Sequence, residues 1–402
     1  MRFCKVLAVA AFAVLLLAFS TAALAQNNAP AFVDGIGTAK FGLDKSATNF
    51  SADATTIPYF RSTFTDPTNG VTYPYTMVGT NPANGDATTT VPTVIIPFNF
   101  VFINSPIANN SLDGTTKATL TAQSPLFQVA DIGTAASSTA SAPPPPPVAT
   151  AGRTVNEPSD VTQVGDAIYR AKWGNTSSGY HVLLGQPTVL PTVTITVPKN
   201  QGFMIVGSVS GRRIGLMDIH WFANQLNNTM RSYHISPTVL PIFLLYNTFL
   251  YDTTPANCCV LGFHGATTSL NGNGKQQVQT YMFGSYSDAG IFGRKPGDSI
   301  SYIQDIHGLS HEVQEWLDDP FVNNAVNPWL TPTAPQYGCT RALETGDPVV
   351  GFGFSVAMPN SVTYHPEDEV HYSWFARENP SRAEQGYYTY LNNFAGVANG
   401  CN

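Results

Sequence analysis

The sequence predicts an α+β fold, in which a β-rich N-terminal region precedes a domain that combines a mixed sheet with one prominent polar helix. Charged residues make up only 11% of the chain, whereas threonine, proline, glycine and aromatic residues are plentiful. This balance favours sheets with many turns over helical bundles. Strand-like segments also occur in groups ahead of the helical ones, which is typical of α+β domains.

Residues 1–25 have the layout of a secretory signal peptide. Arg2 and Lys5 precede an apolar run from Val6 to Phe19, and Ala23–Ala25 resembles a cleavage site. The run is too short for a permanent anchor, and no later stretch is apolar for the length that a membrane span requires. We expect a secreted protein, extracellular or periplasmic, without a stable membrane span; an uncleaved N-terminal anchor is the alternative.

Charge excludes nucleic acid as a partner. Without Arg2 and Lys5 the chain carries 17 basic and 26 acidic side chains, a net charge of −9, and it has no basic run.

Four cysteines remain after residue 25, which suits an oxidising compartment and allows three disulfide connectivities. Cys258 and Cys259 are adjacent and would point to opposite faces of a strand, so each would need a separate partner, Cys339 or Cys401. Two buried free thiols at these adjacent positions are the alternative.

Composition along the chain predicts the domain organisation. Residues 26–134 form a β-rich domain, since Ile57–Val129 reads as strands and turns that include the apolar run VPTVIIPFNFVFI. Residues 135–152 form an exposed linker or insertion, because five consecutive prolines cannot join a sheet interior. Residues 153–402 form the second, α+β domain.

In the second domain, patterns of apolar residues predict strands on both sides of a first helix. The helix covers Met217–Met230, where apolar residues recur at helical spacing. The predicted strands are Tyr180–Leu184, Thr188–Val197, Val239–Tyr246, Cys258–Phe263 and Gln277–Tyr286.

The segment HEVQEWLDDP, His311–Pro320, predicts a second helix with two different faces. At about 100° per residue, His307, His311, Glu315 and Asp318 share one face. Acidic side chains near the end of a helix are unfavourable by up to about 1 kcal/mol each, and a nearby cation would remove the conflict. The opposite face, which we expect to be the buried one, carries Ile306, Leu309, Val313 and Leu317.

His311 and Glu315 lie one helical turn apart, so they are spaced to hold a metal ion between them, with Glu312 beside it. Downstream, the segment LETGDP supplies Glu344 and Asp347 around a glycine turn, where short acidic side chains can be aimed back at the helix. The alternative is an exposed helix face with a chance histidine and several acids, because an HExxE string has low specificity.

Two other segments receive a structural interpretation. His264, which follows a strand in GFHG, could border the site but is expected to be a structural histidine. Pro366 predicts the first position of a helix, with Glu367, Asp368 and Glu369 in its first turn, where acids suit the helix dipole without any functional role.

The segment SHEVQEW, Ser310–Trp316, resembles the HExxH helix of zincin metallopeptidases, with Glu315 in place of the second histidine. Together with LETGDP, it is similar to secreted proteins that combine an SHExxE…DP helix with a later ExGD. These include the phosphate-induced (EXORDIUM-like) family and a group of bacterial secreted proteins. The resemblance covers about Leu240–Val350 and implies a zincin-like domain in which the motif helix is the active-site helix.

The resemblance implies a role for each matching residue. His311, Glu315 and Glu344 would bind a zinc ion, and Glu312 would be the general base that acts on a metal-bound water. Asp347 would support these ligands or replace one of them as an alternate ligand. From their positions on and after the same helix, His307 and Asp319 are further candidates to support the ligands. A second carboxylate ligand weakens zinc's Lewis acidity and favours harder ions, so Ca²⁺ or Mn²⁺ is the alternative.

Two functions follow from this site. One is a zinc-dependent, metallopeptidase-like hydrolase that cleaves a peptide or protein substrate. The alternative is a non-catalytic extracellular or cell-envelope protein whose metal site is structural and which binds a polymer or protein partner.

Overall fold

The computed structural model describes the chain from residue 50 onward, with gaps. The described residues are 50–133 except 104, 106 and 108, then 161–173, 177–207, 210–292, 303–330, 338–379, 386–398 and 401. The predicted signal peptide at 1–25 and the predicted linker at 135–152 lie outside these residues.

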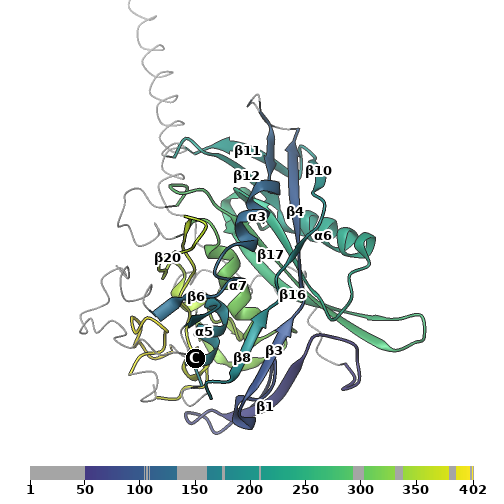
Figure 1. Ribbon diagram of the computed structural model, residues 1–402. Helices are drawn as coiled ribbons and strands as arrows, with labels where there is room; N and C mark the ends of the chain where they lie inside the picture. The colour runs from purple at the N-terminus through teal and green to yellow at the C-terminus, as the bar shows by residue number, and fades with distance from the viewer. Residues whose placement is uncertain are drawn as a thin grey trace, which may run out of the picture.

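The central element is a mixed sheet whose strands come from both halves of the chain (Figure 1). Four neighbouring strands are parallel, and the edge strand β16 is antiparallel to its neighbour β17. The predicted α+β class with a mixed sheet is therefore confirmed. In order, the strands are β10 (Val193–Val197), β4 (Thr93–Phe102), β13 (Leu240–Tyr246), β17 (Gln276–Tyr286) and β16 (Gly262–Leu270), and β4 also pairs with β5 (Ser111–Asp113) and β9 (Thr188–Val189).

Helices α6 (Ile219–Tyr233) and α7 (His307–Asp318) cover opposite faces of this sheet. Successive side chains of a strand point to opposite faces, and in β13 Ile242 packs in one hydrophobic core while Phe243 packs in another. The first core contains apolar residues of α7, and the second contains Phe222 of α6. Figure 1 accordingly shows β17 lying between the two helices.

The first predicted helix is present but begins two residues later than its pattern indicates. Met217 and Asp218 belong to strand β12 (Arg213–Asp218), and the Asp218 side chain caps α6 by accepting a hydrogen bond from the backbone N–H of Trp221. An aspartate at this position satisfies a free N–H of the first turn, and this fixes the start of the helix.

A second, four-stranded sheet follows the order β11, β12, β14 and β15, and the described residues also form five two-stranded pairs. The remaining strands of the four-stranded sheet are β11 (Gly202–Val206), β14 (Thr248–Tyr251) and β15 (Cys258–Val260). The pairs are β1 (Tyr59–Thr65) with β2 (Thr72–Val78), β3 (Ala87–Val91) with β8 (Tyr180–Leu184), β6 (Ala130–Asp131) with β7 (Val161–Thr162), β18 (Ala325–Leu330) with β19 (Cys339–Ala342), and β20 (Val356–Ala357) with β21 (Thr363–Tyr364).

Short helices connect these strands. In the described part of the chain, the remaining α-helices are α3 (Thr115–Ala122), α5 (Val164–Ala171) and α8 (Tyr372–Phe375), and the 3₁₀ helices are η1 (Pro82–Asn84), η3 (Pro255–Asn257) and η5 (Asp347–Val349).

Three of the predicted strands are found as β8, β13 and β17, with ends shifted by at most one residue. The predicted strand Thr188–Val197 is instead two strands, β9 and β10, and Cys258–Phe263 spans β15 and the start of β16, which belong to different sheets. The predicted domain boundary does not coincide with a boundary between sheets. The apolar run VPTVIIPFNFVFI forms the end of β3 and all of β4, and β4 pairs with both β10 and β13. Strand β3 likewise pairs with β8 from beyond the predicted linker. Strands from residues 50–133 and from the later region thus share sheets, which local composition does not reveal.

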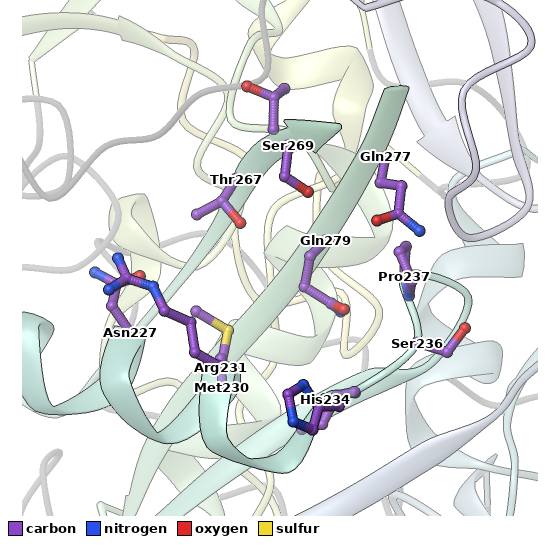
Figure 2. Close-up of a pocket in the computed structure, with 12 residues that line it drawn as sticks. Asn227, Met230, Arg231, His234, Ser236, Pro237, Thr267, Ser269, Gln277 and Gln279 are labelled. Atoms are coloured by element: carbon purple, nitrogen blue, oxygen red, sulfur yellow. The ribbon is translucent and has the colours of Figure 1, made fainter. Parts of the chain in front are cut away.

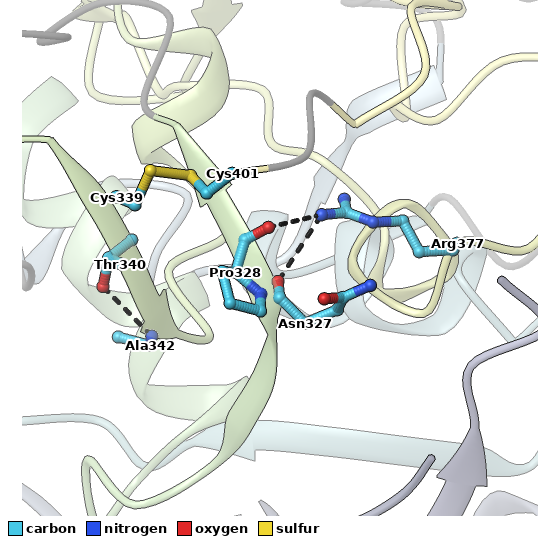
Figure 3. The surroundings of a disulfide bond; sticks show 7 residues. All are labelled: Asn327, Pro328, Cys339, Thr340, Ala342, Arg377 and Cys401. Atoms are coloured by element: carbon cyan, nitrogen blue, oxygen red, sulfur yellow. Dashed lines mark hydrogen bonds between the residues drawn. A yellow bond between two sulfur atoms is a disulfide. The ribbon is translucent and has the colours of Figure 1, made fainter. Parts of the chain in front are cut away.

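The four cysteines in the described part of the chain form two disulfides. Cys339 bonds to Cys401 across 62 positions of sequence, beside the carbonyl groups of Asn327 and Pro328 that accept hydrogen bonds from Arg377 (Figure 3). Cys258 bonds to its neighbour Cys259, so the prediction that each needs a separate partner is wrong. That prediction assumed that adjacent side chains of a strand always point to opposite faces, and this alternation does not hold for the first two residues of β15, which directly follow η3.

The helices among the described residues are all too short or too polar to cross a bilayer.

Candidate metal centre

The predicted motif helix is α7, and it is buried on every side. All 12 of its residues are buried, so the expectation of a single buried face is wrong. One side packs on β17 and β16 of the mixed sheet, and another meets α5, where the Gln314 side chain donates a hydrogen bond to the carbonyl oxygen of Gly165. The polar front is covered by residues of β16, of the turn before η5 and of the segment around Glu367.

The acidic end of α7 receives part of its compensation from a lysine. Asp318 forms an ion pair with Lys172, which follows α5, and both side chains are almost fully buried. Burial raises the pKa of Asp318, and Lys172 opposes that rise. The neighbouring Asp319 caps the next turn by accepting hydrogen bonds from the backbone N–H groups of Asn323 and Asn324, and burial raises its pKa to about 8.

His311 lies at the centre of the covered front. Its Nδ1 is 3.0 Å from Oε2 of Glu367, and its Nε2 is 3.4 Å from Oε1 of Glu315. The backbone N–H of Gly346 donates to the same Glu315 oxygen at 2.9 Å. An oxygen of Asp347, at the start of η5, completes a group of three potential ligand atoms that all lie within 4.8 Å of one another. The structure therefore brings His311, Glu315 and Asp347 together.

Gly346 must be a glycine because the ring of His311 lies directly against it. A Cβ at position 346 would be 2.8 Å from Cγ of His311 and closer still to Nδ1 and Cε1. The glycine turn of LETGDP thus allows the backbone to approach the imidazole and donate to Glu315.

Glu367 connects two histidines of α7. Its Oε2 lies 2.9 Å from Nε2 of His307 as well as 3.0 Å from His311, and its backbone N–H donates to Oγ of Ser310. Burial raises the pKa of Glu367, but the imidazoles of His311 and His307 outweigh that effect and lower it below its usual value. His307, which was expected to support the ligands, contacts Glu367, and Glu367 in turn contacts His311.

The prediction of a helix start at Pro366 is wrong. Residues 365–371 form no helix, and α8 is the single turn Tyr372–Phe375. Glu367, Asp368 and Glu369 are buried, and each makes specific contacts. Asp368 accepts backbone hydrogen bonds from Tyr390 and Leu391, while Glu369 accepts one from Oγ1 of Thr345.

The pKa values of Asp368 and Glu369 reflect this burial. Burial raises the pKa of Asp368 to about 7, although backbone N–H groups oppose the rise. Burial also raises the pKa of Glu369 well above its usual range, with His311 opposing and Glu315 and Glu367 adding to the rise. From the local sequence, a favourable interaction with a helix dipole is enough to explain these acidic residues. Their contacts with Tyr390, Leu391 and Thr345 become visible only in the tertiary fold.

Glu312 points to the other side of the helix front, toward His264 of β16. Oε2 of Glu312 is 3.3 Å from Nδ1 of His264, and Oε2 of Glu315 is 3.9 Å from the same nitrogen. These three residues form a second group of potential ligand atoms within 4.8 Å of one another. His264, predicted to be structural, therefore lies in the cluster and contacts two of its carboxylates.

Glu344 is fully buried in the turn after β19. Among the described residues, no group of three potential ligand atoms within 4.8 Å of one another contains it, and Asp347 occupies that place beside His311 and Glu315.

A pocket of about 860 Å³ lies elsewhere, between the end of α6 and strands β16 and β17. Arg231 and His234 line it from the helix end, and Gln277 and Gln279 line it from β17 (Figure 2). None of its lining residues belongs to the cluster around α7.

Comparisons with protein-family models, with curated proteins and with solved structures give no match to this chain.

Proposed function

We propose that this chain is an exported metal-binding protein in which His311, Glu315 and Asp347 hold a divalent ion that fastens α7 to the turn at η5. The supporting observation is the meeting of three buried potential ligand atoms from two separate elements. A metal-binding histidine commonly donates its second N–H to a carboxylate, and Glu367 is placed to accept that hydrogen from Nδ1 of His311. The Nε2 lone pair then faces Glu315.

The distances and donor types fit zinc. Two ligands bound to a tetrahedral zinc ion at about 2.0–2.1 Å lie about 3.3 Å apart, close to the 3.4 Å between Nε2 of His311 and Oε1 of Glu315. An imidazole nitrogen among the donors favours zinc over calcium, which takes oxygen ligands. Manganese is the alternative, because two of the three donors are carboxylates.

The burial of the cluster supports a structural role for the ion. A catalytic zinc site keeps one position open to water and substrate, whereas a structural site is closed. The His311 side chain is only 5% exposed and that of Glu315 is 0% exposed. The ion would then stabilise the fold of an extracellular or cell-envelope protein that binds a polymer or protein partner, and two disulfides in the structure support export to an oxidising compartment.

The test compares metal content and thermal stability in wild type and His311→Ala, with His220→Ala as the control. His220 also faces a carboxylate, Asp252 at 3.3 Å, but its side chain is 43% exposed. We expect wild type and the control to retain zinc after dialysis and to lose several degrees of melting temperature with chelator, because a ligand of the folded state stabilises it. His311→Ala should retain less zinc and respond less to chelator. A wild type without bound metal, or a melting curve unchanged by chelator, would overturn the proposal.

A second candidate function is a zinc-dependent, metallopeptidase-like hydrolase. The observation that favours it is the position of Glu312, whose carboxylate lies within 4.8 Å of potential ligand atoms of Glu315 and His264. A base at this position would take a proton from a water molecule activated by the metal.

The hydrolase predicts that zinc-loaded protein cleaves members of a peptide library. Glu312→Gln should abolish cleavage while it retains the ion held by His311, Glu315 and Asp347, because Glu312 is not in that group of potential ligands. If the zinc-loaded wild type cleaves no peptide, the structural role remains.

A further inference from the structure

Glu315 faces two different imidazole rings with its two carboxylate oxygens. Its Oε1 lies 3.4 Å from Nε2 of His311, and its Oε2 lies 3.9 Å from Nδ1 of His264. The same Nδ1 lies 3.3 Å from Oε2 of Glu312. The two groups of potential ligand atoms therefore share Glu315 and use a different oxygen of it for each histidine.

The hydrogen bond at Nε2 of His264 determines whether Nδ1 of the neutral ring carries a hydrogen or a lone pair. Nε2 of His264 lies 3.2 Å from the backbone carbonyl oxygen of Asp319. A carbonyl oxygen only accepts, so Nε2 carries the hydrogen and donates it. In the neutral ring, Nδ1 therefore presents a lone pair toward the carboxylate oxygens of Glu312 and Glu315. Atoms that face one another with lone pairs repel, so a cation or a proton must lie between them.

This arrangement matches the one at His311. A histidine that binds a metal through one nitrogen usually donates the other N–H to a carboxylate or to a backbone carbonyl. His311 has the carboxylate of Glu367 in that place, and His264 has the carbonyl of Asp319. Each ring also directs its remaining nitrogen toward an oxygen of Glu315.

The backbone of β16 holds Glu312 in this position. A Cβ at Gly262 would lie 2.6 Å from Cγ of Glu312 and closer to Oε1, so only glycine allows the strand to approach this side chain. Glu312, Glu315 and His264 are 0–1% exposed at their side chains, and a divalent ion would offset the cost of burying the two carboxylates.

We propose that the cluster holds a second divalent cation, bound by His264, Glu312 and Glu315, and that Glu315 bridges it to the ion at His311. The proposal rests on the proposed function for that first ion. Shared ligands hold the two ions of known two-metal sites about 3.5–4 Å apart, and one carboxylate with an oxygen on each ion is such a ligand. A protonated His264 paired with Glu312 is the competing arrangement.

The first test counts zinc ions per chain by elemental analysis after the protein is loaded with zinc and dialysed. We expect two ions in wild type and in the surface control His220→Ala, and one ion each in His264→Ala and in His311→Ala. One ion in both wild type and His264→Ala would overturn the second site and leave the proposed function standing. No ion in wild type would overturn both, and two ions in His264→Ala would overturn the assignment of His264 as a ligand.

The second test needs no variant and therefore does not depend on how the variants fold. Wild type loaded with Mn²⁺ alone is measured by electron paramagnetic resonance. Elemental analysis should find two Mn²⁺ ions per chain, and two ions bridged by Glu315 should give an exchange-coupled spectrum instead of the signal of isolated ions. A spectrum of isolated Mn²⁺ ions at full loading would overturn the bridged pair.

Discussion

The contact between Gly346 and His311 makes Gly346→Ala a direct test of the candidate metal centre. Gly346 has φ −82° and ψ −36°, a conformation that alanine adopts easily. At such positions a change from glycine to alanine stabilises a protein by about 0.4–1 kcal/mol, because it restricts the unfolded chain. At position 346, however, the new Cβ would lie 2.8 Å from Cγ of His311 and closer to Nδ1. The ring must move, and its 3.0 Å contact with Glu367 must break.

The magnitude follows from two costs. Inserting a methyl group into a packed interior costs about 1–3 kcal/mol, and the loss of a hydrogen bond to a charged group costs about 1.5–3 kcal/mol. After the gain from the unfolded chain is subtracted, we expect Gly346→Ala to lower the free energy of unfolding by about 2–5 kcal/mol. It should also remove the zinc ion at His311, because Nε2 no longer faces Glu315.

The assay is urea denaturation combined with zinc analysis, with Gly272→Ala as the matched control. Gly272 lies in the turn between β16 and β17, outside the left-handed backbone region, and a Cβ there would meet no atom within 4 Å. The control should be neutral or slightly stabilising and should keep all its zinc. The reasoning is refuted if Gly346→Ala matches the control in both stability and zinc content.

Three further predictions concern the surroundings of the site. Lys172→Met leaves Asp318 buried without its cation and should lower the free energy of unfolding by about 3–5 kcal/mol, with recovery when Asp318→Leu is added; a loss below about 1 kcal/mol would contradict this. Burial raises the pKa of Asp368 to about 7, so the carboxyl group holds its proton more tightly in the folded protein than in the unfolded chain. As pH rises from about 4 to 7, the free energy of unfolding of wild type should therefore fall by up to about 4 kcal/mol relative to that of Asp368→Asn. A difference independent of pH would exclude this titration. Cys401→Ser opens a loop of 62 positions and should lower the free energy of unfolding by about 4 kcal/mol. Reductant should then destabilise wild type by more than it destabilises the variant, which keeps only the Cys258–Cys259 bond; equal losses would contradict this.

The sequence predicts those features of the site that depend on local spacing. The pair His311 and Glu315 is visible because positions four apart share one face of a helix, and their atoms do lie 3.4 Å apart. The strands of the mixed sheet are visible because apolar runs bounded by turns mark buried strands. Which strands become neighbours is not visible, since β4 pairs with β13 across more than a hundred residues and no local pattern encodes that pairing.

The residues that complete the site come from far along the chain. Glu367 is 56 positions from His311, and His264 is 48 positions from Glu312. The segment HPEDEV has the composition of a helix start because proline and acids suit a first turn. It remains extended because Asp368 satisfies backbone N–H groups of Tyr390 and Leu391, and those partners lie outside any local window. Lys172 was missed for the same reason, since its partner Asp318 is 146 positions away.

The carboxylate at position 315 is the point where the motif departs from HExxH, and a substitution there separates one bound ion from two. A carboxylate has two equivalent oxygens, and in Glu315 one faces His311 while the other faces His264. A neutral imidazole has one nitrogen with a lone pair and one that carries hydrogen, so it can bind an ion on one side only. Glu315→His should therefore reduce two zinc ions per chain to one, whereas Glu315→Asp, which keeps both oxygens on a shorter stem, should retain two with weaker binding. Elemental analysis of the two variants tests whether both oxygens of Glu315 bind an ion. Equal zinc content in both variants would mean that the second oxygen holds no ion.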